Sequence, residues 1–224
     1  MTIHDPDVVF TDLALAILGG FLSWRLSQQG LGQRVTRSGV TIMAALASAA
    51  FFGAVFHAFF TAGTTTLAGF LAWIPVSLSI VVLSAALLEL ALGVLLPRVP
   101  SGARSAAVLV YAAAFAAVVV LVDESYSTIV RFYGPTLILF LIVAAVQGTR
   151  PGATGWRILA IALVVSIAAA VVQQRRIAIH PVYFDHNALY HVVQGIGLVL
   201  LYLGFTRGGG SSPALTFPSS SSAH

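Results

Sequence analysis

The chain has 224 residues, of which 58% are hydrophobic and 8% are charged, and its formal net charge is +4. Soluble domains carry about 25% charged residues, so this composition excludes an ordinary soluble domain. Long apolar stretches between short polar segments indicate a helical protein with several membrane spans. The sequence has neither cysteine nor lysine. It therefore has no disulfide, no thiolate metal site and no lysine for a retinal Schiff base.

Seven apolar stretches are long enough to cross a bilayer, which takes about 20 apolar residues. They run over residues 9–27, 39–61, 68–96, 104–122, 128–147, 156–173 and 187–205. We therefore predict an all-α fold, a seven-transmembrane helix bundle that occupies residues 1–207. Residues 208–224 are rich in Gly, Ser and Pro, and we expect them to form a disordered tail.

The arginines predict how the bundle sits, because cytoplasmic loops of membrane proteins are enriched in basic residues. Arginines flank the first, third and fifth connections and follow the last span: Arg25, Arg34, Arg37, Arg98, Arg104, Arg150, Arg157 and Arg207. The sixth connection breaks this pattern with Arg175 and Arg176. On balance we predict the N-terminus outside and the C-terminus in the cytoplasm. This topology accounts for the positive charge, so we expect no nucleic-acid partner.

Arginine as the only basic residue, together with abundant alanine, favours a GC-rich bacterial source. The expected location is therefore the bacterial inner membrane. Most of the other ionisable residues fall near the predicted outer ends of the spans: Asp12, His57, Asp123, Glu124, His180, Asp185, His186 and His191. Ionisable groups inside a membrane are costly and usually face the bundle interior or a wet cavity. We expect His57 and His191 to face each other at similar depth.

The segment FDHNALYHVVQ (residues 184–194) opens the last span with unusually many polar residues. Asn187 and His191 are four residues apart, and Gln194 follows after three more, so the three share one helix face. We predict that Gln194, Tyr190 and His180 line a pocket for a small molecule or a membrane lipid.

Two short segments resemble a known family. GAVFHAF (53–59) resembles the Ser-x-x-Phe-His segment of the alkaline ceramidases, and NALYH (187–191) resembles their His-Ala-Leu-Trp-His. Those enzymes belong to a seven-helix superfamily that includes the adiponectin and progestin receptors. Its members hold zinc with one histidine of the second helix and two of the seventh. The resemblance implies zinc ligands at His57 and His191, and attack of zinc-bound water on a lipid amide.

This sequence departs from the ceramidase pattern at three positions. Gly53 stands in place of a serine, Ala68 in place of an aspartate, and Asn187 in place of the first histidine of the last helix. The third metal ligand is therefore missing from its expected place. We predict His186 as that ligand, with Asp12, Asp123 and Glu124 as alternatives. The chain also resembles uncharacterised bacterial seven-helix proteins that carry a His-Asn-x-Leu-Tyr-His segment.

Three functions are consistent with these residues. The first is a zinc-dependent membrane hydrolase of lipid amides or esters, in which Asp12 or Asp123 is the base and Asn187 holds water or a substrate carbonyl. The second is a non-catalytic receptor or lipid-binding protein, which the altered positions Gly53 and Asn187 favour. The third is a b-type haem protein with His57 and His191 as axial ligands. The sequence predicts no particular oligomeric state.

Overall fold

The structure is a computed structural model that describes residues 4–30, 33–60, 62–180 and 183–208. Seven α-helices and one short 3-10 helix follow one another in this part of the chain: α1 Pro6–Ser27, α2 Arg34–Phe59, η1 Gly63–Thr65, α3 Leu67–Leu95, α4 Ser101–Leu121, α5 Tyr126–Gly148, α6 Thr154–Gln174 and α7 His186–Gly208. All seven α-helices are long and apolar enough to cross a membrane. The prediction of an all-α protein with seven spans is confirmed.

Polar side chains next to the helix ends explain where several helices begin. The Thr66 side chain accepts a hydrogen bond from the Gly69 N–H at the start of α3, and Ser125 does the same for the Thr128 N–H of α5. Each side chain satisfies an N–H that has no partner within its helix. Pro75 lies inside α3 and Pro135 inside α5, and both helices continue through them.

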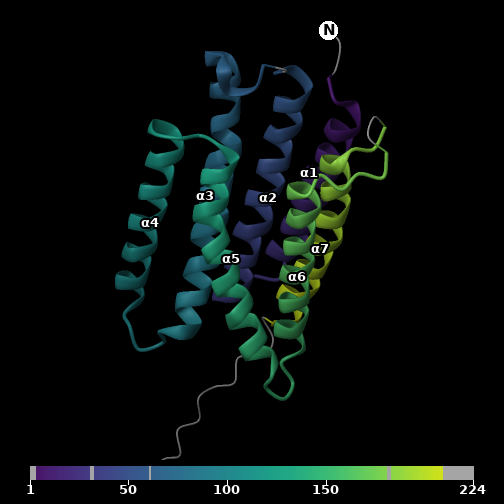
Figure 1. Cartoon of the computed structure of the whole chain (residues 1–224). Coiled ribbons are helices and arrows are strands. Elements are labelled where there is room, and N and C mark those ends of the chain that lie inside the picture. The colour runs from purple at the N-terminus through teal and green to yellow at the C-terminus, as the bar shows by residue number, and fades with distance from the viewer. Residues whose placement is uncertain (1–3, 31–32, 61, 181–182, 209–224) are drawn as a thin grey trace, which may run out of the picture.

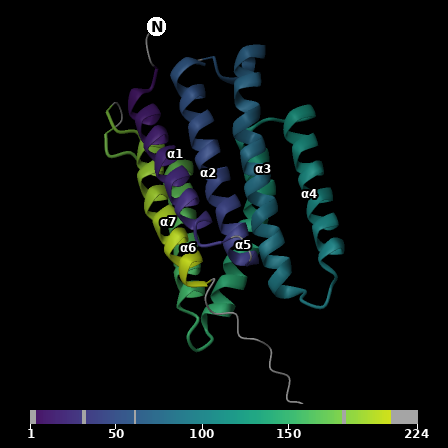
Figure 2. The same cartoon turned by 180° about the vertical axis from the view of Figure 1, so that it is seen from behind.

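The helices run alternately up and down, so the starts of α1, α3, α5 and α7 lie at one end of the molecule (Figures 1 and 2). We call this end the N-terminal end and the opposite one the C-terminal end. Each of the six helices α1, α2, α3, α5, α6 and α7 packs against the next in that order, and α7 returns to α1. These six helices form a closed ring. The remaining helix, α4, lies outside the ring and packs mainly against α3.

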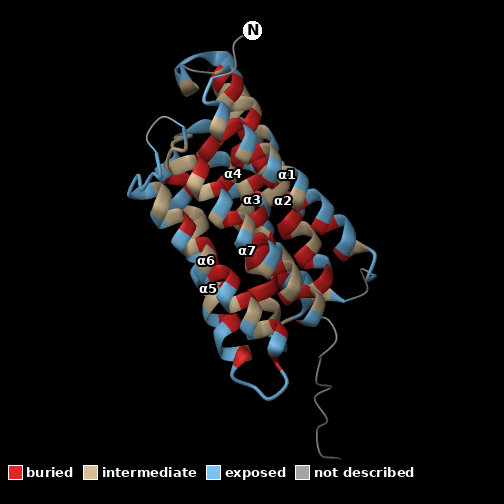
Figure 3. Cartoon of the chain, turned by 90° about the vertical axis from the view of Figure 1, so that its right-hand side faces the viewer, coloured by how far each residue is buried: buried red, intermediate tan, exposed pale blue. Residues whose placement is uncertain are grey.

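Apolar side chains cover both the inside and the outside of the bundle. Buried residues lie along the facing sides of the helices, and exposed residues along their outer sides (Figure 3). The exposed residues include large apolar side chains, such as Ile17 with 73% of its surface exposed and Leu109 with 68%. Lipid tails are as apolar as these side chains, so no polar outer face is needed. The chain is therefore a membrane protein.

Glycine residues allow α6 and α7 to pack closely. A Cβ atom added to Gly204 would lie 2.7 Å from the side chain of Leu159, and one added to Gly155 would lie 2.7 Å from the Cα of Gly208. Both distances are shorter than a normal contact between carbon atoms, which is about 3.5–4.0 Å. Small residues at such contacts let helix backbones approach each other in membranes.

Two predicted features concern the ends of the chain. Gly208 was predicted to begin the tail, but it is buried and is the last residue of α7, because it packs against Gly155. The rest of the predicted disordered tail, residues 209–224, lies outside the described residues. Eight of the eleven arginines lie at the C-terminal end of the bundle. The orientation in the membrane stays a prediction based on this asymmetry.

Candidate functional site

A cavity of about 120 Å³ lies inside the ring near the N-terminal end. All six ring helices contribute to its lining. Its polar side chains are Asp12, His57, Trp73, Tyr126, Gln173, Tyr190, His191 and Gln194. We call this space the polar cavity. In a membrane bundle, a cluster of polar side chains in the interior is costly and so indicates a functional site.

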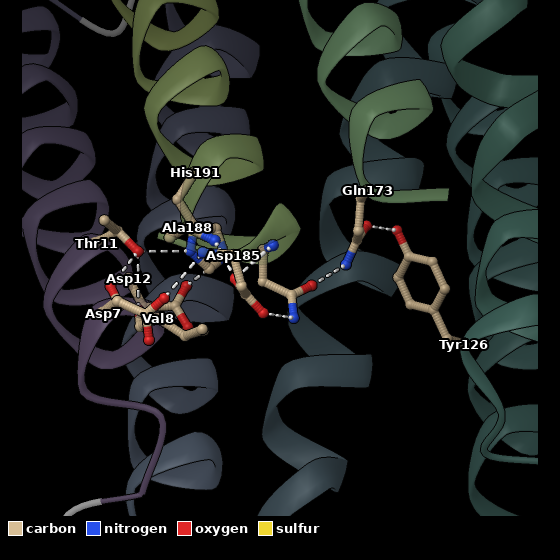
Figure 4. Close-up of polar contacts among 10 residues, drawn as sticks. Asp7, Val8, Thr11, Asp12, Tyr126, Gln173, Asp185, Ala188 and His191 are labelled. Atoms are coloured by element: carbon tan, nitrogen blue, oxygen red, sulfur yellow. Dashed lines mark hydrogen bonds and ion pairs between the residues drawn. The ribbon is translucent and has the colours of Figure 1, made fainter. Parts of the chain in front are cut away.

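Asp12 of α1 and His191 of α7 form the closest polar contact at this cavity. Asp12 Oδ1 lies 3.0 Å from His191 Nε2, and the two side chains are only 5% and 8% exposed. On the other side of the imidazole, Nδ1 lies 3.0 Å from the hydroxyl of Thr11. Figure 4 shows His191 between these two residues of α1. Carboxylate, imidazole and hydroxyl are thus connected in series within the membrane.

Thr11 contacts one nitrogen of the His191 ring, and Asp12 contacts the other. The Thr11 hydroxyl donates to the main-chain oxygens of Asp7 and Val8, at 2.8 and 3.0 Å. Its oxygen also lies beside His191 Nδ1, and the tautomer of the ring decides which of the two groups is the donor. A proton must lie between His191 Nε2 and Asp12, since two lone pairs would otherwise face each other at 3.0 Å. The pair therefore holds a proton that either partner can carry.

Gly53 of α2 makes room for the Asp12 carboxylate. A Cβ atom added at Gly53 would lie 3.1 Å from Asp12 Oδ2 and 3.5 Å from Asp12 Oδ1. Gly53 occupies the position where the ceramidase segment has a serine. The absence of a side chain here lets Asp12 reach across to His191.

His57 of α2 lines the same cavity as His191. Its side chain is half-buried and forms no hydrogen bond within the described part of the chain. The ring nitrogens of His57 are therefore available to a ligand in the cavity. The hypothesis that His57 and His191 are the axial ligands of a haem stays a prediction.

A second string of hydrogen bonds crosses the N-terminal end from α7 to α5 (Figure 4). Asp185 Oδ1 accepts the main-chain N–H groups of Asn187 and Ala188, which caps α7. The Asn187 side chain donates to Asp185 and accepts from Gln173 of α6. Gln173 in turn accepts a 2.7 Å hydrogen bond from the Tyr126 hydroxyl. This string holds α5, α6 and α7 together above the polar cavity.

A larger cavity of about 300 Å³ adjoins the polar cavity. It lies between α5 and α6, and Tyr126, Tyr190 and Gln194 line both spaces. Most of its other lining residues are apolar. We call it the side cavity. A ligand with one polar and one apolar part would therefore find both environments next to each other.

The structure brings five of the nine predicted site residues together at the polar cavity: Asp12, His57, Tyr190, His191 and Gln194. The other four line neither cavity: Asp123, His180, His186 and Asn187. His186 instead lies 3.6 Å from Asp185, and Asn187 forms the capping contacts described above. His180 lies in the connection between α6 and α7, where its ring contacts Tyr183. Asp123 precedes α5 and bonds to Ser125 and Thr128.

The polar cavity contains three side chains of types that bind zinc. Asp12, His57 and His191 line one cavity, and a carboxylate with two imidazoles is a donor set that zinc accepts. Within the described ranges no three His, Asp or Glu side chains lie close enough to share an ion. A metal at these residues would compete with the contact between Asp12 and His191. The donor set suits zinc in its chemistry, but these side chains would have to move closer together to share one ion, so the zinc site stays a prediction.

Comparison with known proteins gives one match. A family described as "Family of unknown function (DUF6962)" matches residues 8–209. The chain belongs to this family. The match covers every residue of the polar cavity and the side cavity. No curated protein and no solved structure matches the chain.

Thr11, Tyr126 and Gln173 belong to the site but were not among the predicted site residues. A threonine in an apolar helix usually bonds to its own main chain, which Thr11 also does, so its second role has no sequence signal. Tyr126 and Gln173 lie at helix ends, where aromatic and polar residues are common at membrane interfaces.

Asp123 supports a prediction about acid stability. The Thr128 hydroxyl, together with the N–H and hydroxyl of Ser125, bonds to this carboxylate and lowers its pKa below the ordinary 3.8. The ionised carboxylate therefore stabilises the folded state above pH 3.8, and this contribution is lost as the pH falls through the lowered pKa. Thermal unfolding should separate wild type from Asp123→Asn at pH 6, with the gap closing in stronger acid. A gap that is the same at both pH values would contradict the prediction.

Proposed function

We propose that this protein is an integral membrane hydrolase that cleaves a lipid amide or ester at the polar cavity. The observation that supports this most directly is the buried contact between Asp12 and His191, which holds a proton beside a cavity for a ligand. General acid–base catalysis needs such a pair within reach of the reacting atoms. The side cavity provides an adjoining space for the apolar part of a lipid.

In the proposed reaction, water attacks the carbonyl carbon of the substrate. Asp12 lines the cavity, and its carboxylate takes the proton that the water loses. The bond between the carbonyl carbon and the leaving oxygen or nitrogen then breaks. The leaving atom receives a proton from the pair, which returns to its starting state. His57 donates from its ring to the carbonyl oxygen as negative charge develops there.

We propose zinc as a cofactor for an alternative form of this site, in which Asp12, His57 and His191 would be its ligands in place of the proton-transfer roles described above. When bound, zinc supplies a Lewis acid and lowers the pKa of a bound water towards about 7. Thr11 orients the His191 ring through Nδ1. Such a contact to the second ring nitrogen is usual for histidines that bind metals.

We also propose that the N-terminal end of the bundle faces the outside of a bacterial inner membrane. Eight arginines lie at the opposite end, as expected for a cytoplasmic side. The polar cavity would then open towards the outer leaflet.

A non-catalytic lipid-binding protein is the second candidate. Asn187 stands where the ceramidase segment has its first histidine, but its groups are engaged with Asp185 and Gln173 at the start of α7. Asn187 is therefore not free to take over the role of that histidine, which favours this candidate. This candidate uses the same two cavities but predicts no release of product.

Hydrolysis and metal content of the purified protein test the proposal. The protein in lipid nanodiscs is offered fluorescent acyl amides and acyl esters, and zinc is measured by elemental analysis. Asp12→Asn and His191→Ala are expected to slow hydrolysis at least about 100-fold, as for the loss of a general acid–base. His186→Ala is the matched control, because His186 lines neither cavity, and it should keep both activity and zinc.

Two results would count against the proposal. Hydrolysis that survives both substitutions would place the reaction elsewhere. Binding of the acyl probes without any hydrolysis would favour the non-catalytic candidate.

A further inference from the structure

The side cavity opens sideways towards the hydrocarbon of the bilayer. Val130 and Ile138 of α5 and Val171 of α6 line it, and they are 38%, 54% and 49% exposed on the outer surface of the bundle. Exposed apolar side chains in a spanning bundle contact lipid tails. Gly134 lies midway between Val130 and Ile138 on the same face of α5, so no side chain closes this opening. An acyl chain can therefore enter from the bilayer.

Arg175 lies at the end of the side cavity that is nearest to the membrane surface. It directly follows α6, lines the cavity and is exposed. Within the described residues its side chain forms no hydrogen bond or ion pair. Arg104 and Arg157 at the other end of the bundle differ, because they donate to main-chain oxygens. The guanidinium of Arg175 is therefore free to bind a ligand.

The preference of arginines for the cytoplasmic side does not explain why an arginine stands at position 175. Arginines that set orientation lie on the cytoplasmic side, and Arg175 lies at the opposite end of the bundle from most of them. The described lining of the side cavity contains no Asp or Glu. A lipid with an ammonium group would find no partner there, whereas a phosphate suits the planar guanidinium.

We infer that the ligand of this site is an anionic phospholipid of the surrounding bilayer. One acyl chain lies in the side cavity, and Arg175 binds the headgroup phosphate. The ester between headgroup and chain lies at the junction of the two cavities, which Tyr126, Tyr190 and Gln194 line. The inference rests on the proposed function, because it names the substrate class of the same site.

Binding of short-chain lipids to the purified full-length protein tests this inference without relying on catalysis. The probes are dioctanoyl phosphatidylglycerol, which is anionic, and dioctanoylglycerol, which lacks the phosphate. Wild type is expected to bind the anionic probe about tenfold more tightly, since a charge-assisted hydrogen bond contributes about that factor. Arg175→Gln should abolish this preference. Arg176→Gln is the matched control, because Arg176 is the exposed neighbour that lines neither cavity, and it should keep the preference.

A second pair of variants tests the place of the acyl chain. A Cβ atom added at Gly134 meets no atom within 4 Å, so the side chain of Gly134→Leu can extend into the cavity opening. It should weaken both probes at least tenfold. Gly20→Leu is the control, since Gly20 is equally open but lies on the outer side of α1.

The outcomes separate the inference from the proposed function. Equal binding of both probes by wild type, or a preference that Arg175→Gln leaves intact, would overturn the anionic ligand but leave the hydrolase untouched. Unchanged binding in Gly134→Leu would overturn the chain position. Loss of hydrolysis in Asp12→Asn with normal lipid binding would support both proposals. Failure of both probes to bind, without hydrolysis of any acyl substrate, would reject the two together.

Discussion

Asp12→Ala is expected to lower the free energy of unfolding by about 2 kcal/mol, because it leaves a buried polar group of His191 without its hydrogen-bond partner. Asp12 and His191 are almost fully buried and lie 3.0 Å apart, so neither can turn to water when the other is removed. His191→Ala should cost a similar amount. The double variant should cost little more than either single change, since the contact can be lost only once.

Unfolding by sodium dodecyl sulfate in mixed micelles measures these differences. His57→Ala is the control, because His57 lines the same cavity but has no hydrogen bond within the described residues. His57→Ala should lower the free energy of unfolding by less than Asp12→Ala or His191→Ala does. Fully additive effects of Asp12→Ala and His191→Ala would show that their contact does not contribute to stability.

Gly155→Ala is expected to lower the free energy of unfolding by about 3 kcal/mol, which is at the upper end of the usual effect of an overpacked side chain. The added methyl group would meet the main chain of Arg207 and Gly208, each 2.7 Å from its Cβ. A flexible side chain could turn away from such a contact, but backbone atoms move only if α6 and α7 separate. The packing of α6 against α7 would therefore weaken at the C-terminal end of the bundle.

Gly102→Ala is a closely matched control. Gly102 is the second residue of α4, as Gly155 is of α6, and a Cβ atom added to it meets no atom within 4 Å. Alanine favours helix over glycine by about 1 kcal/mol, so Gly102→Ala should be neutral or stabilising. The same unfolding measurement compares the two variants. Equal stability of both would show that α6 and α7 can adjust to the extra methyl group.

The hydropathy of the sequence predicts the helices well, but it places some ends incorrectly. The second span was predicted to begin at residue 39, whereas α2 begins at Arg34. Residues 34–38 are mostly polar, so an apolar pattern does not include them, yet polar residues continue a helix into the membrane surface. The same reasoning explains why α7 runs to Gly208 rather than to residue 205.

The site was predictable only where helix periodicity or depth in the membrane decides the outcome. His191 and Gln194 lie on one face and both line the polar cavity. Asn187 was expected on that face, but it sits in the first turn of α7, where the Asp185 cap draws it away. The contact between Asp12 and His191 joins helices that are far apart in the chain, so no spacing in the sequence could specify it. That Gly53 makes room for the Asp12 carboxylate is visible only in the structure, where the two residues lie side by side.

Because α4 lies outside the ring, a label can be attached to it without changing the six ring helices. Among the described residues, none from α4 lines either cavity. The chain has no cysteine, so one introduced at the exposed Ala113 would be its sole thiol. A spin label attached there would report the depth and tilt of the bundle in a bilayer while leaving the six ring helices unmodified. The label and the two cavities would thus lie on different helices.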